Sequence, residues 1–143
     1  MPKIMKSINV ISRCQTVYRT ARLPELAGGY HMYIYAVCGQ PGRSQEELAR
    51  DLNLNKSSVA RALSYLEEEG YVRREPDARD RRERRVYPTE RAEAILPRVR
   101  EVSAEWTAEI SSGISEDDMA IFESVLAKIA ERARAVAGRE DLP

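Results

Sequence analysis

The chain has 143 residues, of which 43% are apolar, and it carries 23 basic and 23 acidic side chains. This length suits one packed domain with appended helices and is too short for two full-sized domains. No apolar run approaches the roughly 18 residues that cross a bilayer, and the first ten residues lack the apolar core of a secretory signal. We therefore expect a cytoplasmic protein with no membrane partner.

The zero net charge conceals an uneven distribution of charge along the chain. Residues 1–42 carry five basic groups and one acidic group, whereas residues 101–143 carry ten acidic and four basic groups. Attraction to phosphate depends on the local field rather than on the total. A neutral total therefore does not exclude a nucleic-acid partner.

The first two predicted helices are both rich in apolar residues. Residues 3–22 place apolar side chains at helical spacing, and Pro24 is expected to end this helix. A second helix is predicted between the Gly28-Gly29 pair and Gly39. It is apolar nearly all round, so we expect it to be buried.

Two short helices joined by a tight turn follow. Ser44 and Glu47 have the spacing of a capping box, which predicts a helix ending at about Leu52. Residues 53–55 form the predicted turn, whose final asparagine caps the next helix, and Gly70 ends that helix. This order is the outline of a helix-turn-helix.

A strand pair with an arginine-rich tip comes next. Residues 71–75 and 84–88 are predicted strands around a tip at 76–83. The hairpin contains seven arginines and four acidic residues, an excess of three positive charges. The arginines are Arg73, Arg74, Arg79, Arg81, Arg82, Arg84 and Arg85. A hairpin can project this charge into a groove of DNA, as the wing of a winged helix does.

Two long helices complete the prediction. Thr89 caps the first, which Pro97 should kink, and Ser115 caps the last, which ends at Gly138. Their apolar stripes exceed what the core of a winged helix needs, so we expect a two-fold dimer. The predicted fold is one mainly α (α+β) domain over 1–143. Residues 1–24 and 89–143 are its dimerisation helices, and 26–88 its winged helix-turn-helix lobe.

The predicted DNA contacts come from two elements. The outer side of the second short helix would face the major groove, and the tip would face the minor groove. Asp80 is expected to brace the tip by pairing with a neighbouring arginine. The expected contacts are Lys56, Ser57, Ser58, Arg61, Ser64, Arg79, Arg81 and Arg82. The alternative is an ordinary capped surface helix followed by a solvated run of mixed charges.

Taken together, these motifs resemble those of the multiple antibiotic resistance regulator (MarR) family of bacterial transcription factors. The resemblance is carried by the stretch SQEELARDLNLNKSSVARALSYLEEEGYVRR and by the D-x-x-D-R-R wing at 77–82. The segment VYPTERAEA departs from the family pattern, which has a leucine before the threonine and a glycine soon after it. The resemblance implies that Arg82 enters the minor groove and that Asp80 braces the wing.

The resemblance further implies a homodimer that binds a pseudo-palindromic operator in double-stranded DNA, as a repressor or an activator. A small molecule, for example an aromatic or phenolic compound, or an oxidant would change the affinity of the protein for this operator. The family's pocket lies between the dimerisation helices and the DNA-binding lobe. The expected lining is Arg13, Tyr30, His31, Tyr33, Ile34 and Trp106. These residues could equally form a packed aromatic core.

The remaining inventory leaves few alternatives. Cys14 could sense oxidants, but it shares an apolar stripe with Val10 and Val17, and buried cysteines are usually inert. With His31 as the single histidine, no metal or other cofactor is expected. No motif of an enzyme is present. The rival function is a winged-helix protein-interaction module whose terminal helices form the docking surface.

Overall fold

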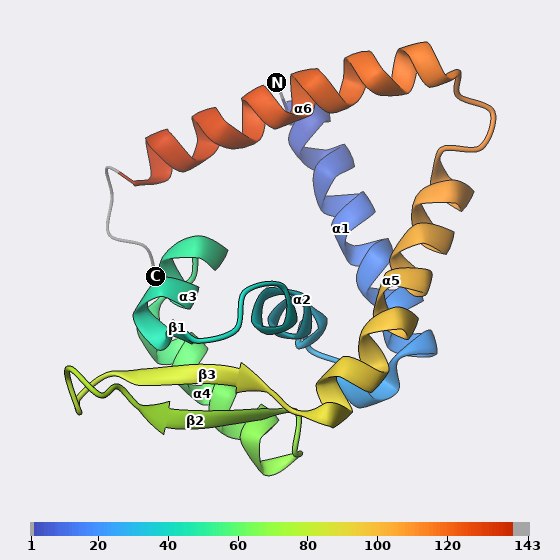
Figure 1. Cartoon of the computed structure of the whole chain (residues 1–143). Coiled ribbons are helices and arrows are strands. Elements are labelled where there is room, and N and C mark those ends of the chain that lie inside the picture. Colours follow the sequence, from blue (N-terminus) through green and yellow to red (C-terminus); the bar gives the residue numbers. More distant parts are fainter. Residues whose placement is uncertain (1, 139–143) are drawn as a thin grey trace.

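The computed structural model of the chain describes residues 2–138, which are mainly helical, with a small sheet at one edge of the molecule (Figure 1). The helical elements are α1 (Pro2–Arg22), the 3-10 helix η1 (Pro24–Leu26), α2 (His31–Gly39), α3 (Gln45–Leu52), α4 (Lys56–Glu68), α5 (Glu90–Ile110) and α6 (Glu116–Ala137). The strands are β1 (Arg43–Ser44), β2 (Val72–Pro76) and β3 (Arg84–Pro88). The mainly α winged helix-turn-helix fold that the sequence predicts is confirmed.

The helix starts follow from local capping. The Ser44 side chain accepts a hydrogen bond from the Glu47 backbone N–H, and both halves of the capping box are formed. Asn55 accepts from the Ser58 N–H at 2.7 Å and so caps α4. Asn53 adopts a left-handed φ of 59° at the end of α3. These caps satisfy backbone groups that a helix end leaves without partners. The predicted helix-turn-helix is therefore present, with its expected boundaries.

The sheet contains one strand more than the sequence predicted. Its order is β1-β3-β2, with both pairs antiparallel. In the hairpin, Val72 lies opposite Pro88 and Pro76 lies opposite Arg84. β1 has only two residues, Arg43 and Ser44, so no alternation could indicate it. Its pairing with β3 attaches the start of α3 to the base of the wing.

The core lies between α2, the helix-turn-helix and the sheet. As predicted, α2 is largely buried, since Tyr33, Ile34 and Val37 are each at most 5% exposed. Figure 1 shows α2 at the centre of the lobe, between the sheet and the long helices. The inward side of α4 contributes Val59, Leu63 and Leu66, and the other buried apolar residues are Leu23, Leu26, Leu48, Ala49, Tyr71, Val72, Val86, Ala92, Val99 and Val102. The core of the lobe is therefore completed by Leu23 and by residues of α5.

The terminal helices are arranged differently. α1 lies along α5, where the rings of Tyr18 and Trp106 are 5.2 Å apart, and α5 continues through Pro97. α6 runs across the end of α1 in Figure 1 and has no buried residue among those described. Within residues 2–138, no helix combines the length and the hydropathy that crossing a membrane would need.

Candidate nucleic-acid interface

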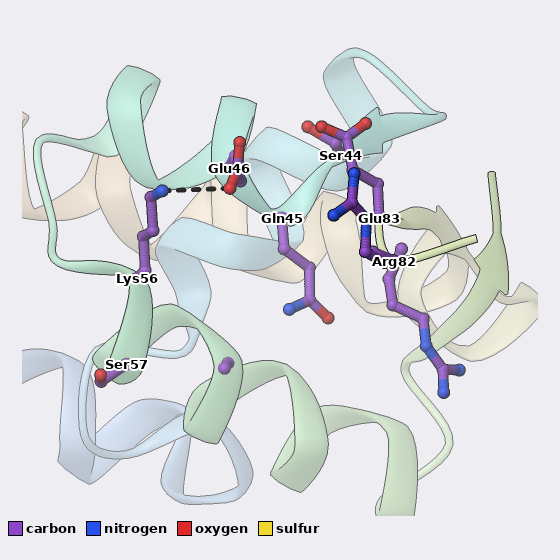
Figure 2. Close-up of a pocket in the computed structure, with 9 residues that line it drawn as sticks. Ser44, Gln45, Glu46, Lys56, Ser57, Arg82 and Glu83 are labelled. Carbon is purple, nitrogen blue, oxygen red and sulfur yellow. Dashed lines mark hydrogen bonds and ion pairs between the residues drawn. The ribbon is translucent and has the colours of Figure 1, made fainter. Parts of the chain in front are cut away.

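A hollow of about 300 Å³ separates the helix-turn-helix from the wing. It is lined by Ser44, Gln45, Glu46, Lys56, Ser57, Ala60, Arg82, Glu83 and Arg84. The first turns of α3 and α4 form one wall, and the hairpin forms the other. Figure 2 shows the side chains of Lys56, at the start of α4, and Glu46, on α3, facing each other on the helical wall of this hollow. The predicted recognition helix and the wing tip therefore open onto one shared surface.

The predicted contacts on α4 are arranged as its helical period requires. Lys56, Ser57 and Arg61 are exposed, whereas Ser58 and Ser64 are half-buried. The Lys56 ammonium lies 3.0 Å from a Glu46 carboxylate oxygen, and both side chains are more than half exposed. This carboxylate partner was not foreseen, because Glu46 is ten residues away on another helix.

Ser64 has a partner within the protein. Its hydroxyl accepts a hydrogen bond from Arg74 Nη2 at 3.2 Å. The same guanidinium also reaches Gln45 and Glu67. The structure thus gives Ser64 a role in holding the lobe together, in addition to the DNA contact that the sequence predicts.

The wing tip has the brace that the sequence predicted. Asp80 accepts from the Arg82 backbone N–H at 3.0 Å and from its Nε at 3.2 Å. The Arg82 side chain is nevertheless 92% exposed. It is therefore both oriented and accessible. Arg79 and Arg81 are also exposed, and within residues 2–138 their side chains form no ion pair.

A second brace was missed by sequence reasoning. Asp77 is only 7% exposed; it accepts from the Arg79 backbone N–H at 2.8 Å and pairs with Arg85 Nη2 at 2.8 Å. These interactions, led by the Arg79 hydrogen bond, hold the pKa of Asp77 below its usual value. Arg85 also donates to the Gly42 carbonyl at 2.8 Å. The first aspartate of the D-x-x-D-R-R motif was the available signal.

The residues expected to line an effector pocket are not brought together. Arg13 and Trp106 border a hollow of about 450 Å³ between α1 and α5. Tyr30 and Tyr33 border a separate hollow of about 470 Å³ beside α4. Ile34 is fully buried in the core and lines neither of these two hollows. Within this set, the Tyr30 ring stacks on Tyr65 of α4, with centroids 4.4 Å apart.

His31 occupies an unusual environment. Its Nδ1 is buried and has no hydrogen-bond partner in the structure. Burial, together with the nearby positive charge of Arg19, lowers the pKa of His31 to about 4. The imidazole is therefore neutral at physiological pH.

The expectation that Cys14 is buried is wrong. Cys14 is exposed, beside Trp106 in the hollow between α1 and α5. The apolar stripe on α1 predicted burial, but Cys14 stays exposed although Tyr18, one turn further along α1, packs against Trp106 of α5. The inert interpretation of this thiol therefore does not rest on burial within the single chain. Among the described residues, no cluster of three or more His, Cys, Asp or Glu side chains could hold a metal ion.

Comparison with known proteins identifies this arrangement. Residues 26–83, which include α2, the helix-turn-helix and the wing tip, match the model of the MarR family. The chain is 24% identical over 131 residues to an uncharacterised HTH-type transcriptional regulator, YybA, of Bacillus subtilis (strain 168). That match covers 90% of this chain and 87% of YybA.

Solved structures extend the likeness over nearly the whole chain. The crystal structure of MarR is 28% identical, with a TM-score of 0.83, covering 95% of this chain and 94% of that one. A regulator from Listeria monocytogenes, assigned to the MarR family and crystallised in complex with 26mer DNA, is 21% identical. Its TM-score is 0.84, and 97% of each chain is covered. Residues 26–83 thus match the MarR family of transcription regulators, and the chain as a whole is similar in fold to the solved MarR structure.

Proposed function

We propose that this regulator acts as a homodimer that binds a pseudo-palindromic operator sequence-specifically. In each copy α4 enters the major groove, and the wing reaches into the adjacent minor groove. Binding represses transcription until a small aromatic or phenolic effector releases the protein. Lys56, Ser57, Ser58 and Arg61 are the proposed contacts from α4, and Arg79, Arg81 and Arg82 are those from the wing.

The observation that carries this proposal is the shared surface of α4 and the wing. Arg82 is held by Asp80 while its side chain stays 92% exposed, and Arg61 is exposed on the outer side of α4. An exposed arginine on a braced tip suits insertion into a narrow minor groove. The relative from Listeria monocytogenes that was crystallised with DNA has the same fold.

The proposed dimer rests on apolar surface that the single chain leaves exposed. Phe122, Val125 and Ile129 on α6 are each more than 40% exposed, as are Val10 and Ile11 on α1. Monomeric proteins rarely expose long apolar stripes of this kind. A two-fold interface would bury them and would place two α4 helices on one side of the duplex.

The test is a titration of the full-length protein against DNA from upstream of its own gene, at several salt concentrations. A shuffled duplex of equal length is the control. We expect specific binding whose logarithm falls linearly with log salt, at about −0.9 per neutralised phosphate. The footprint should be two-fold, with half-sites about 10 base pairs apart, centre to centre. Equal affinity for the shuffled duplex would contradict the proposal and favour a protein-interaction module.

The effector is tested separately. Thermal unfolding of the protein is compared with and without aromatic acids, phenols and peroxides, each at fixed protein concentration. A ligand that binds the folded state raises the unfolding temperature by mass action. A compound that also releases the operator would be an effector. If no compound in the panel does both, release by an aromatic or phenolic molecule is contradicted.

A further inference from the structure

A largely buried guanidinium lies at the root of the wing and is not itself among the proposed DNA contacts. Arg74 of β2 is 17% exposed. Its Nη1 donates to Gln45 Oε1 at 3.0 Å, and its Nη2 donates to Ser64 Oγ at 3.2 Å and Glu67 Oε1 at 3.0 Å. The Arg74 backbone N–H donates to the other Glu67 oxygen at 3.0 Å. One residue thus joins α3, α4 and the wing.

The position of Arg74 along its strand gives these bonds a consequence. Side chains alternate in a strand, so Val72 and Arg74 face the helices. Val72 is in the core, whereas Glu75 and Pro76 are already exposed. Arg74 is therefore the last side chain of β2 that is held against the helices before the hairpin projects towards its tip. Its bonds determine the direction in which the wing leaves the lobe.

The chemistry of the site suits arginine in particular. The planar guanidinium offers donors in a fixed fork, which a lysine ammonium cannot reproduce. Its hydrogen bond lowers the pKa of Glu67 below the usual value, so that carboxylate stays charged as a partner. Arg74 Nε is buried without a partner. The fold thus tolerates one unmet hydrogen bond while the guanidinium keeps its other bonds.

We infer that Arg74 is a positioning residue of the DNA interface. It holds α4 and the wing in one fixed relation, so that Arg61 and Arg82 meet the duplex at the same time without a separate ordering cost. Ser64 supports this geometry through its hydrogen bond to Arg74. This inference rests on the proposed function, because it concerns the geometry of operator binding.

The first test compares R74Q with the matched control R73Q. Arg73 is the adjacent residue on the opposite, exposed side of β2, where it pairs with Glu75 at 3.1 Å. Each variant removes one positive charge at nearly the same place, so the loss of general attraction is similar. We expect R74Q to bind the operator about tenfold more weakly than R73Q at matched salt, the size of a lost groove contact. Equal affinities would overturn the inference.

The salt dependence separates positioning from direct contact. If Arg74 touches no phosphate, R74Q and R73Q should show the same slope of log affinity against log salt. A slope for R74Q that is shallower by about one unit than that of R73Q would mean that Arg74 binds a phosphate itself. That result would also overturn the inference.

A double-mutant cycle tests the coupling to the wing tip. R82A should weaken binding less in the R74Q protein than in the wild type, because the wing is already misdirected there. If Arg74 merely stabilised the fold, the losses of operator affinity caused by R74Q and by R82A would be additive once the folded fraction is matched. Additive losses would therefore refute the positioning role. If R74Q unfolds, the double variant Q45A/S64A removes two acceptors while the Arg74 guanidinium keeps its ion pair with Glu67. It should lose about threefold in affinity, less than R74Q because the Glu67 bond persists.

The controls separate this inference from the proposed function. Failure of the wild-type protein to prefer the operator over a shuffled duplex would refute the proposed function. Specific binding by the wild type that Q45A/S64A retains in full would refute only the role of Arg74 and its partners. Thermal unfolding of each free variant sets the folded fraction used in both comparisons.

Discussion

The DNA-binding lobe and the terminal helices use apolar residues in opposite ways. In the lobe, Leu63 and Leu66 of α4 are fully buried, and polar bridges such as Asp77–Arg85 hold the elements around them. On α6, comparable apolar residues such as Phe122 and Ile129 remain exposed. The difference teaches that the lobe, together with Ala92, Val99 and Val102 of α5, buries its apolar residues within the chain, whereas α6 requires a surface that the single chain does not provide.

The largest expected effect is in the core of the lobe. L63A should lower the free energy of unfolding by about 2–5 kcal/mol, because it leaves a cavity in a closed core. Chemical denaturation of the full chain measures it. L126A, at a residue of α6 that is 38% exposed, is the matched substitution. The loss of stability that L126A causes should depend on protein concentration, as expected if a second copy covers that side chain. Equal, concentration-independent losses would remove the contrast between the two regions.

The next largest effect concerns the exposed face of α6. I129D places a charge in the proposed dimer interface and should weaken association by about 2 kcal/mol or more, as loss of an interface hot spot does. Light scattering during size-exclusion chromatography measures the mass. E123Q, a neutral change on the same helix, is the control. A variant that stays dimeric at micromolar concentration would show that this face serves some other purpose.

In the lobe, R82A should weaken operator binding by about 1–3 kcal/mol, by analogy with other groove contacts. Fluorescence polarisation at matched salt measures this loss. R98A removes the same charge from an exposed residue of α5 that pairs with Glu101, and should have little effect. If both variants bind as the wild type does, the wing takes no part in recognition.

A smaller effect, in this case a gain in DNA affinity, is expected at the hollow between the helix-turn-helix and the wing. The Glu46 carboxylate pairs with Lys56 at 3.0 Å, so it competes with phosphate for that ammonium. E46Q should strengthen DNA binding by about 0.5 kcal/mol, the scale of an exposed ion pair. The salt slope should also become steeper. Titrations of E46Q and of E46Q/K56Q distinguish this release from a contact made by residue 46 itself, which would persist in the double variant.

The smallest effect near neutral pH comes from His31. Its folded pKa of about 4 lies below the ordinary 6.5, so the unfolded chain takes up a proton first as pH falls. The contribution of neutral His31 to the free energy of unfolding is complete above pH 6.5 and should decline progressively towards pH 4. The melting temperature should therefore fall less over this window in H31Q than in the wild type. Parallel curves would mean that His31 does not contribute.

The local sequence was enough to predict the long helices, the hairpin and one part of the wing brace, the pair Asp80–Arg82. Ser44 and Asn55 cap helices through neighbours three residues away, and Asp80 binds Arg82 two residues away. Such short-range bonds depend on spacing that can be read along the chain. The two-residue strand β1 escaped because its formation depends on β3, more than forty residues later.

The arrangement of the candidate sites was beyond a reading of the sequence. The bond between Arg74 and Gln45 spans 29 residues, and nothing in either segment specifies the other. The expected effector residues share aromatic character, yet Tyr30 stacks on Tyr65 while Trp106 packs on Tyr18. Cys14 lies on an apolar stripe and is exposed all the same. Each outcome depends on which element packs against which.

The amino-acid order by itself determined the helix boundaries, the hairpin with its arginines and the family resemblance, because caps, turns and periodic patterns act over a few residues. Only the tertiary structure decided that the wing root is clamped by Arg74, that Lys56 meets Glu46, and that Tyr30 stacks on Tyr65. Burial and long-range polar pairing arise when distant segments meet, and that meeting has no local signature in the chain.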